Sequence, residues 1–148
     1  MDFKKITKAA LIPAAAMIVL GIISTVIAIL LRGNLMISFM LGLGFLALNF
    51  LIAAYGGYRA VKQYGLDLIG AVLTGALSYG AAGIVNGTLS LILLISGLTP
   101  LTASASSVEG GMTFMIIGGL IGLVIGFFIA IVLGAVLGLI GGFVAEKL

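Results

Sequence analysis

The sequence contains no cysteine and no histidine, and only 7% of its 148 residues are charged. Without cysteine there are no disulfide bonds and no thiol chemistry, and without histidine the chain lacks a common metal ligand and the commonest general base. A soluble domain carries about 25% charged residues. The composition, which is 63% hydrophobic, therefore excludes a soluble globular domain and indicates a membrane protein.

Acidic residues are also scarce, and they lie at or outside the ends of long apolar runs. They are Asp2, Asp67, Glu109 and Glu146. A proton-coupled carrier needs a carboxylate near the bilayer midplane, and a metal centre needs clustered ligands. The sequence offers neither. Without histidine, cysteine or a carboxylate inside the apolar runs, acid–base catalysis also lacks its usual side chains. We therefore expect no enzyme activity, no catalytic residue, no metal and no cofactor. The net charge of +3 is too small and too scattered to predict nucleic-acid binding.

Four apolar runs exceed the roughly 18 to 20 residues needed to cross a bilayer. They cover residues 9–31, 35–58, 68–98 and 112–145. We predict an all-α, polytopic membrane protein, with residues 1–148 forming one domain of four transmembrane helices in two antiparallel hairpins. The first run is about 23 residues long, against 7–15 for the core of a signal peptide, so we expect it to remain as a membrane helix. Pro13 should fall in the first turn of that helix, where its missing N–H costs little.

Lysine and arginine are distributed unevenly between the predicted loops. Three precede the first helix, two lie between helices 2 and 3, and one follows helix 4, all on one side of the membrane. The other side has only Arg32, in the first loop. The positive-inside rule then places both termini in the cytoplasm, and we expect a multi-pass protein of the cell membrane.

The last apolar run has a small residue at every fourth position. The row is Gly118, Gly122, Gly126, Ala130, Gly134, Gly138 and Gly142. In a soluble helix each interior glycine costs about 1 kcal/mol relative to alanine, whereas in lipid small residues let two helix backbones approach closely. Four residues advance a helix by about 400°, so the row drifts by about 240° over its length. We therefore expect the first three glycines to face one neighbour and the last three another. Either one neighbour is a second copy of the chain, or all the glycines pack inside one four-helix bundle.

The third run repeats this spacing. Its row is Ala71, Gly75, Tyr79, Gly83 and Gly87. We predict that helices 3 and 4 form the tightest pair, with the Tyr79 ring filling the groove left by the glycines of helix 4. The candidate helix-packing residues are Gly75, Gly83, Gly87, Gly118, Gly122, Gly126, Gly134, Gly138 and Gly142.

Two amide side chains lie inside apolar runs, Asn49 in helix 2 and Asn86 in helix 3. Intramembrane polar groups are functional candidates, although neither amide can titrate. One interpretation is that they join helices by hydrogen bonds to each other or to nearby serine hydroxyls. The alternative is that they contact a solute or an ion.

The lengths of the last two runs lead to a further prediction. At 1.5 Å per residue, continuous helices over 68–98 and 112–145 would span about 46 and 50 Å, against a hydrocarbon core of about 30 Å. We expect them to be longer than helices 1 and 2, and to project together about 10–15 Å farther out than the first hairpin. The alternative is a break in helix 3 at residues 86–88, which would free backbone groups to bind a ligand.

A glycine pattern in the middle of the chain resembles that of a known group of proteins. The pattern is Gly56-Gly57-Tyr58-Arg59-Ala60, then Gly65, Asp67, Gly70-Ala71, Gly75-Ala76, Gly80 and Gly83. It is similar to small glycine-rich four-helix integral membrane proteins of unknown function, found mostly in archaea. The resemblance covers residues 42–98 and the end of helix 4. It implies a prokaryotic cytoplasmic-membrane protein, and it brings no activity, ligand or site.

These observations favour a small integral membrane protein that acts by helix packing, as a self-associating or accessory subunit of a membrane assembly. Its expected partners are the lipid bilayer and either itself, as a homo-oligomer, or another membrane protein. An alternative is a small homo-oligomeric channel or carrier for a small solute, lined by Asn49 and Asn86. A third hypothesis is a scaffold for a soluble partner, bound through Arg59, Lys62 and Lys147.

The orientation can be tested with a reporter that is active only in the cytoplasm. Fused to either terminus it should work, and inserted in the loop at residues 99–111 it should fail, because that loop carries no lysine or arginine. Reporter activity in the loop would contradict the assignment based on charge.

Overall fold

The computed structural model describes residues 2–31, 35–97 and 111–148, and it contains four long helices in these ranges. They are α1 (Phe3–Leu30), α2 (Leu35–Tyr64), α3 (Leu68–Ile95) and α5 (Gly111–Lys147). The prediction of an all-α protein with four helices is confirmed. Each helix is long and apolar enough to cross a membrane. The predicted loops at residues 32–34 and 98–110 lie outside the described part of the chain.

The first two helices extend beyond the apolar runs that predicted them. α1 begins at Phe3 rather than near residue 9, because the Asp2 carboxylate caps it by accepting a hydrogen bond from the Lys5 N–H at 3.3 Å. α2 continues to Tyr64 rather than ending near residue 58. Hydropathy marks the part of a helix that fits in lipid, whereas backbone hydrogen bonds continue the helix into the interface. Pro13 consequently lies inside α1, not in its first turn.

A three-residue link joins α2 to α3. Gly65 ends α2 with a φ of +61°, a conformation that glycine adopts without a steric penalty, and its N–H donates to the Val61 carbonyl at 3.1 Å. The Asp67 carboxylate then caps α3 by accepting from the Gly70 N–H at 2.8 Å. So short a link makes α2 and α3 antiparallel neighbours.

α3 is continuous through Asn86, so the alternative with a break at residues 86–88 is wrong. The prediction that helix 3 is longer than helices 1 and 2 is also wrong. α3 ends at Ile95 and has 28 residues, the same number as α1, and Gly97 follows with a φ of +74°. Only α5, with 37 residues, exceeds the others. Helix length therefore favours projection for α5 alone.

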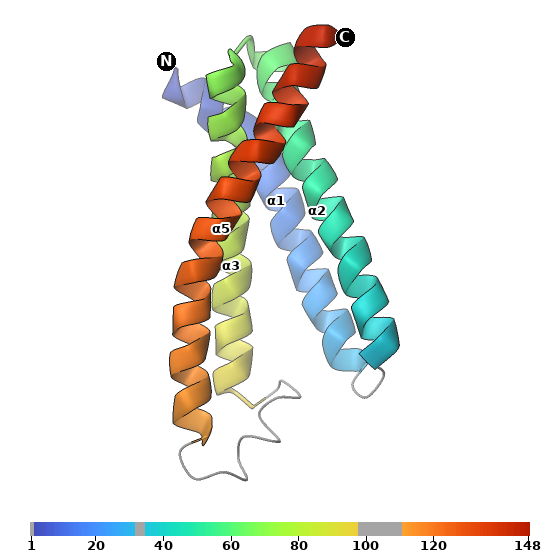
Figure 1. The fold of residues 1–148 in the computed structure, drawn as a ribbon, viewed down its shortest axis with the longest axis vertical. Coiled ribbons are helices and arrows are strands. Elements are labelled where there is room, and N and C mark those ends of the chain that lie inside the picture. The colour runs from blue at the N-terminus through green and yellow to red at the C-terminus, as the bar shows by residue number, and fades with distance from the viewer. Residues whose placement is uncertain (1, 32–34, 98–110) are drawn as a thin grey trace.

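Toward the end away from the termini, α1 lies beside α2 and α3 beside α5, and these two pairs separate (Figure 1). Elsewhere α1 also contacts α3, and α2 contacts α5. Figure 1 shows the pairs meeting at the end that carries both termini and diverging toward the other end. Burial follows this arrangement. Buried residues occur only within 6–17, 53–60, 70–82 and 130–145 of the described chain. We call the half of the bundle with these ranges the terminal half, and the rest of the four helices the loop half.

Glycines allow the helices of the terminal half to meet backbone to backbone. A Cβ on Gly75 of α3 would overlap the Gly134 carbonyl of α5, and a Cβ on Gly138 of α5 would overlap the Ala71 carbonyl of α3. α2 reaches the same place on α5, since a Cβ on Gly57 would overlap the Gly138 backbone. α3 and α5 form the most extensive contact of any helix pair, as predicted.

Helix α1 joins this centre through a proline and a hydroxyl group. Pro13 packs on Gly56 of α2, where an added Cβ would lie 3.1 Å from the proline Cγ. The buried Ser78 hydroxyl of α3 lies 3.2 Å from the Ala10 carbonyl of α1 and 2.7 Å from the Thr74 carbonyl of its own helix. All four helices are thus held together in the terminal half by small groups.

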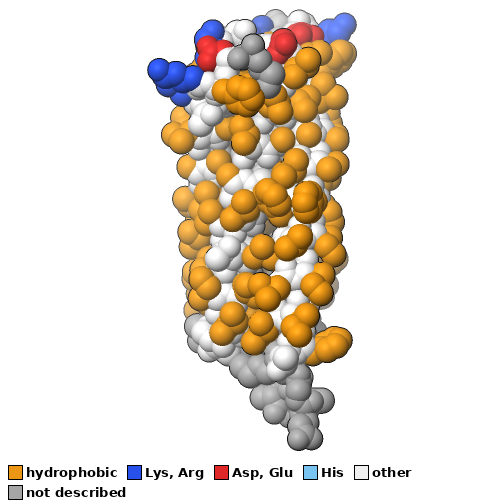
Figure 2. Space-filling model, turned by 90° about the vertical axis from the view of Figure 1, so that its left-hand side faces the viewer, with side chains coloured by type: hydrophobic (Ala, Val, Ile, Leu, Met, Phe, Trp, Pro, Cys, Tyr) orange, Lys and Arg blue, Asp and Glu red, His pale blue; other side chains and the backbone are white. Residues whose placement is uncertain are grey.

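The charged side chains of the described residues gather at the end that carries both termini. Figure 2 shows lysine, arginine and acidic side chains at that end of the molecule and hydrophobic side chains below them. Large apolar side chains stay exposed along all four helices, as expected where the surroundings are lipid. The protein is a small four-span membrane protein. Its orientation relative to the cytoplasm stays a prediction.

The substitution Gly138→Ala tests the close backbone contact. Its methyl group would overlap the Ala71 carbonyl, so we expect a loss of about 1–3 kcal/mol of unfolding free energy, the usual range for overpacking. The matched control is Gly44→Ala in α2, where an added Cβ meets nothing within 4 Å. That control should be neutral or stabilising by up to about 1 kcal/mol, because alanine favours the helix. Denaturant unfolding in detergent, followed by circular dichroism, measures both. Equal effects would contradict the packing scheme.

Candidate functional site

The glycine row of α5 divides into a part that the chain itself covers and a part that it leaves open. Gly134 and Gly138 lie against the α3 backbone, and a Cβ on Gly142 would lie 2.6 Å from the Ala71 Cβ. At Gly118, Gly122 and Gly126, an added Cβ would meet nothing within 4 Å. The change between these two parts coincides with the end of the buried core at Ala130. Among the described residues, the close packing on α5 therefore involves the second part of the row.

The remaining glycines of α3 face α5 with more room. A Cβ on Gly83 would lie 3.2 Å from the Ala130 Cβ, and one on Gly87 would lie 3.6 Å from Leu123. The separation between α3 and α5 thus increases from backbone contact at Gly75 to side-chain contact at Gly87. Tyr79, at the centre of the predicted row, does not fill a groove on α5 with its ring. Its Cβ lies beside Gly134, and its ring lies 6.4 Å from the Phe50 ring of α2.

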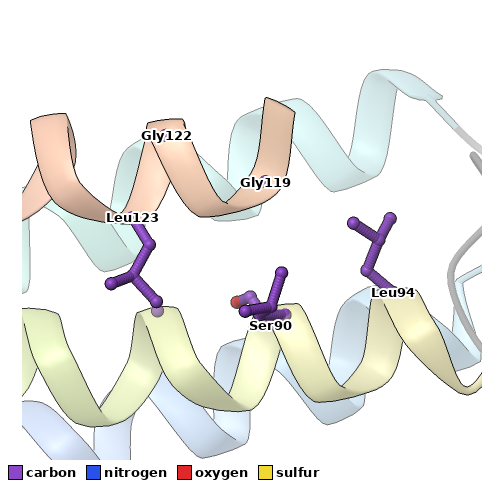
Figure 3. Close-up of a pocket in the computed structure, with 7 residues that line it drawn as sticks. Ser90, Leu94, Gly119, Gly122 and Leu123 are labelled. Carbon is purple, nitrogen blue, oxygen red and sulfur yellow. The ribbon is translucent and has the colours of Figure 1, made fainter. Parts of the chain in front are cut away.

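A groove of about 360 Å³ runs along the α3–α5 pair in the loop half. Its lining residues are Gly87, Ser90, Leu91, Leu94, Gly119, Gly122 and Leu123. Figure 3 shows it between the two helices, with Gly119 and Gly122 on the α5 side and the side chains of Leu94 and Leu123 reaching into it. The groove combines three glycines, which expose backbone, with a single hydroxyl group at Ser90. The sequence predicted Gly87 and Gly122 as helix-packing residues, but neither Gly119 nor the leucines that form the walls of the groove.

A second pocket brings the two candidate amides together. Asn49 of α2 and Asn86 of α3 line a cavity of about 90 Å³ with Tyr79, Met17, Ala82 and Gly83. The Asn86 amide donates to the Met17 carbonyl of α1 at 3.3 Å, so its hydrogen bond goes to backbone rather than to Asn49 or to a serine. Sequence reasoning did not include Tyr79 or Met17 in a polar site. The only available signal was the position of the tyrosine in the middle of the glycine row.

Glycine also makes room for the Asn86 side chain. A Cβ on Gly21 of α1 would overlap the amide group of Asn86. The amide oxygen of Asn86 is buried, and no donor in the described chain reaches it. The described residues contain no group of acidic, histidine or cysteine side chains that could hold a metal. The polar chemistry of this pocket is therefore that of uncharged hydrogen-bonding groups.

At the terminal end, Arg59 folds back onto its own helix. Its guanidinium donates to the Gln63 side chain and lies 5.5 Å from the centre of the Tyr64 ring. Lys147 similarly lies 5.5 Å from the Phe143 ring. These contacts hold two of the three cations considered for a soluble partner against neighbouring side chains of the chain itself.

Comparison of the chain with protein-family models, with curated proteins and with solved structures finds no match. The resemblance to glycine-rich four-helix membrane proteins stays a prediction. Function is therefore inferred from the fold, the open glycines and the two pockets.

Proposed function

We propose that the protein is a small membrane subunit that associates with further copies of itself through the loop half of α5. The observation that carries this proposal is the continuation of the glycine row beyond the chain's own core. Gly118, Gly122 and Gly126 keep the four-residue spacing of Gly134 and Gly138, yet a Cβ on any of them would meet no described residue of the chain within 4 Å.

Glycine inside a helix costs free energy. Each interior glycine is less favourable than alanine by about 1 kcal/mol, so three unused glycines weaken α5. In the terminal half the same residue type permits backbone contact with Gly75 and Ala71. A second helix packed on Gly118, Gly122 and Gly126 would form the same kind of close backbone contact there. Close approach of small residues is the main source of helix association in lipid, where no hydrophobic effect drives the helices together.

The neighbouring groove supports this choice of partner. It continues the α3–α5 contact surface that is closed in the terminal half, and Gly119 and Gly122 form part of its lining. A second copy supplies a helix with matching glycines, and a two-fold axis would place the same surface on both sides of the contact. The proposal includes the location predicted from charge, a cell membrane with both termini in the cytoplasm. It also includes a structural rather than a catalytic role.

Single cysteines test this contact cleanly because the chain has no cysteine of its own. We expect Gly122→Cys to form a covalent dimer under mild oxidation in membranes, since a disulfide requires two Cβ atoms about 3.5–4.5 Å apart. The matched control is Val124→Cys, which lies at the same depth but about 200° around the helix and is 54% exposed. It should stay monomeric on gel electrophoresis.

A second measurement distinguishes self-association from coverage of the surface by lipid. Gly122→Ile should shift the reconstituted protein toward the monomer, as seen by the mass of the detergent-solubilised particle, without lowering the stability of the single chain. The cysteine test is repeated at all three open glycines, with Gly118→Cys, Gly122→Cys and Gly126→Cys. If none of these variants yields more dimer than Val124→Cys, lipid covers this face of α5 and the proposal fails.

The polar pocket favours a second candidate function, a small homo-oligomeric channel or carrier. Asn49 and Asn86 would then border a path for a small solute. Asn49 lines the pocket, so Asn49→Cys is a suitable probe. We expect this cysteine to resist a charged, membrane-impermeant thiol reagent in intact vesicles, because the surrounding pocket is small and uncharged. Rapid labelling would instead favour the channel or carrier.

A further inference from the structure

The charged side chains at the terminal end are divided unequally among the four helices. Among the described residues, α1 and α2 carry five cations, which we call the basic surface. They are Lys4, Lys5, Lys8, Arg59 and Lys62. The one carboxylate beside them is Asp2, which precedes α1. The ends of α3 and α5 have the opposite balance, with Asp67 and Glu146 against Lys147.

The charge of the basic surface is not neutralised by the chain itself. Within residues 2–31, 35–97 and 111–148, no carboxylate forms an ion pair with any of the five cations. The Asp2 carboxylate accepts a hydrogen bond from the backbone of Lys5, as a helix cap. The Arg59 guanidinium donates to the Gln63 side chain, and its Nη2 lies 3.5 Å from the Tyr64 hydroxyl, so both of these partners are uncharged.

The cations of α1 and α2 lie next to each other across the contact between these helices. The Tyr64 hydroxyl lies 3.5 Å from the Arg59 Nη2, and it donates to the Lys8 carbonyl of α1, also at 3.5 Å. Lys62 follows Arg59 by three residues and therefore lies on the same side of α2. The two helices thus contribute to one surface rather than to two separate patches.

The lysines of α1 point away from the bundle. Lys4 and Lys8 lie about 40° apart around the helix, and the buried Ile6 lies about 200° from Lys4. Lys5 lies within about 100° of Lys4, and all three lysines are exposed, as is Lys62 of α2. These four ammonium groups are therefore free to meet a ligand from outside the protein.

Exposed apolar side chains continue the basic surface toward the middle of the membrane. Leu11 and Ile12 follow Lys8 by three and four residues, so they lie on its face of α1, and they are 66% and 52% exposed. On α2, Tyr55 lies two turns before Lys62 and is 49% exposed. Both helices thus place cations toward the terminal end and apolar groups next to them on the membrane side.

This order matches the structure of a phospholipid, whose phosphate lies in the interface and whose acyl chains lie in the hydrocarbon core. A soluble acidic protein could meet the cations, but it would leave the adjoining apolar side chains of α1 and α2 in lipid. Groups of four to eight lysines and arginines at the membrane surface attract anionic lipids, and each cation strengthens binding by about fivefold. The five cations of the basic surface fall in this range.

We propose that the basic surface binds the phosphate groups of anionic phospholipids in the leaflet that surrounds the terminal end. The exposed lysines contact the phosphate, Arg59 adds its charge from its fixed position beside Tyr64, and the acyl chains lie along Leu11, Ile12 and Tyr55. This surface is on α1 and α2, whereas the surface proposed for self-association is on α5, so neither proposal depends on the other.

The experiment uses the full chain, reconstituted in phosphatidylcholine bilayers that contain a trace of spin-labelled lipid. Electron paramagnetic resonance measures the fraction of labelled lipid that the protein immobilises. We expect spin-labelled phosphatidylglycerol to be preferred over spin-labelled phosphatidylcholine by about two- to fivefold at low salt. The preference should be lost at 1 M salt, where the Debye length is about 3 Å. Both leaflets have the same composition, so the result does not depend on orientation.

Single neutral substitutions locate the binding surface. Lys8→Gln and Lys62→Gln should each lower the preference for phosphatidylglycerol, and the double variant should bring it close to one. The matched control is Lys147→Gln, which removes the same charge at the same end but from α5, and it should keep the preference of the unmodified protein. All four positions of the comparison are read at equal helix content by circular dichroism.

A competition arm separates the lipid from a soluble phosphate compound. Glycerol 3-phosphate carries the phosphate without acyl chains, and at matched ionic strength it should not displace the labelled phosphatidylglycerol. Displacement would show that the surface binds a soluble anion instead, and it would overturn the proposal. The proposal is also overturned if the unmodified protein does not prefer phosphatidylglycerol, or if Lys147→Gln lowers the preference as much as Lys8→Gln and Lys62→Gln do.

Discussion

The fold depends on the absence of side chains where α2, α3 and α5 meet. Gly57, Gly75 and Gly138 let three backbones approach so closely that a single Cβ on any of them would overlap a neighbouring main chain. In lipid this contact replaces the hydrophobic core of a soluble protein, because association there relies on close van der Waals packing. α1 is added to this centre by Pro13 and by the hydroxyl of Ser78.

Concentrating the close contacts in one half leaves the other half without a core. Beyond Met17, Ala53, Ala82 and Ala130, no described residue of the loop half is buried. α1 and α2 then separate from α3 and α5 (Figure 1). The open glycines of α5 and the groove beside them lie in this half, and both the amide pocket and its hydrogen bond to α1 lie where the separation begins. The two proposed functions therefore both arise from the same division of the bundle.

The amide pocket also depends on a glycine. Gly21 of α1 provides the room in which Asn86 bonds to the Met17 carbonyl, so a missing side chain on one helix allows a polar side chain on another. Small residues serve here as a means of positioning a hydrogen-bonding group as well as a means of helix packing. Gly21 and Asn86 together place a polar group between two helices in a part of the bundle whose lining residues carry no charge.

The sequence by itself determined the four helices, their approximate positions and the pairing of helices 3 and 4. Hydropathy reports what fits in lipid, and four-residue spacing of small residues reports where backbones meet. It did not determine the helix ends at Phe3 and Tyr64, because these depend on capping and on backbone hydrogen bonds outside the apolar runs. Only the tertiary structure decided which glycines of α5 the chain covers, since equal spacing cannot reveal where two helix pairs diverge. It also decided that Asn49 and Asn86 share a cavity, because that depends on the relative rotation and height of α2 and α3, which no local pattern encodes.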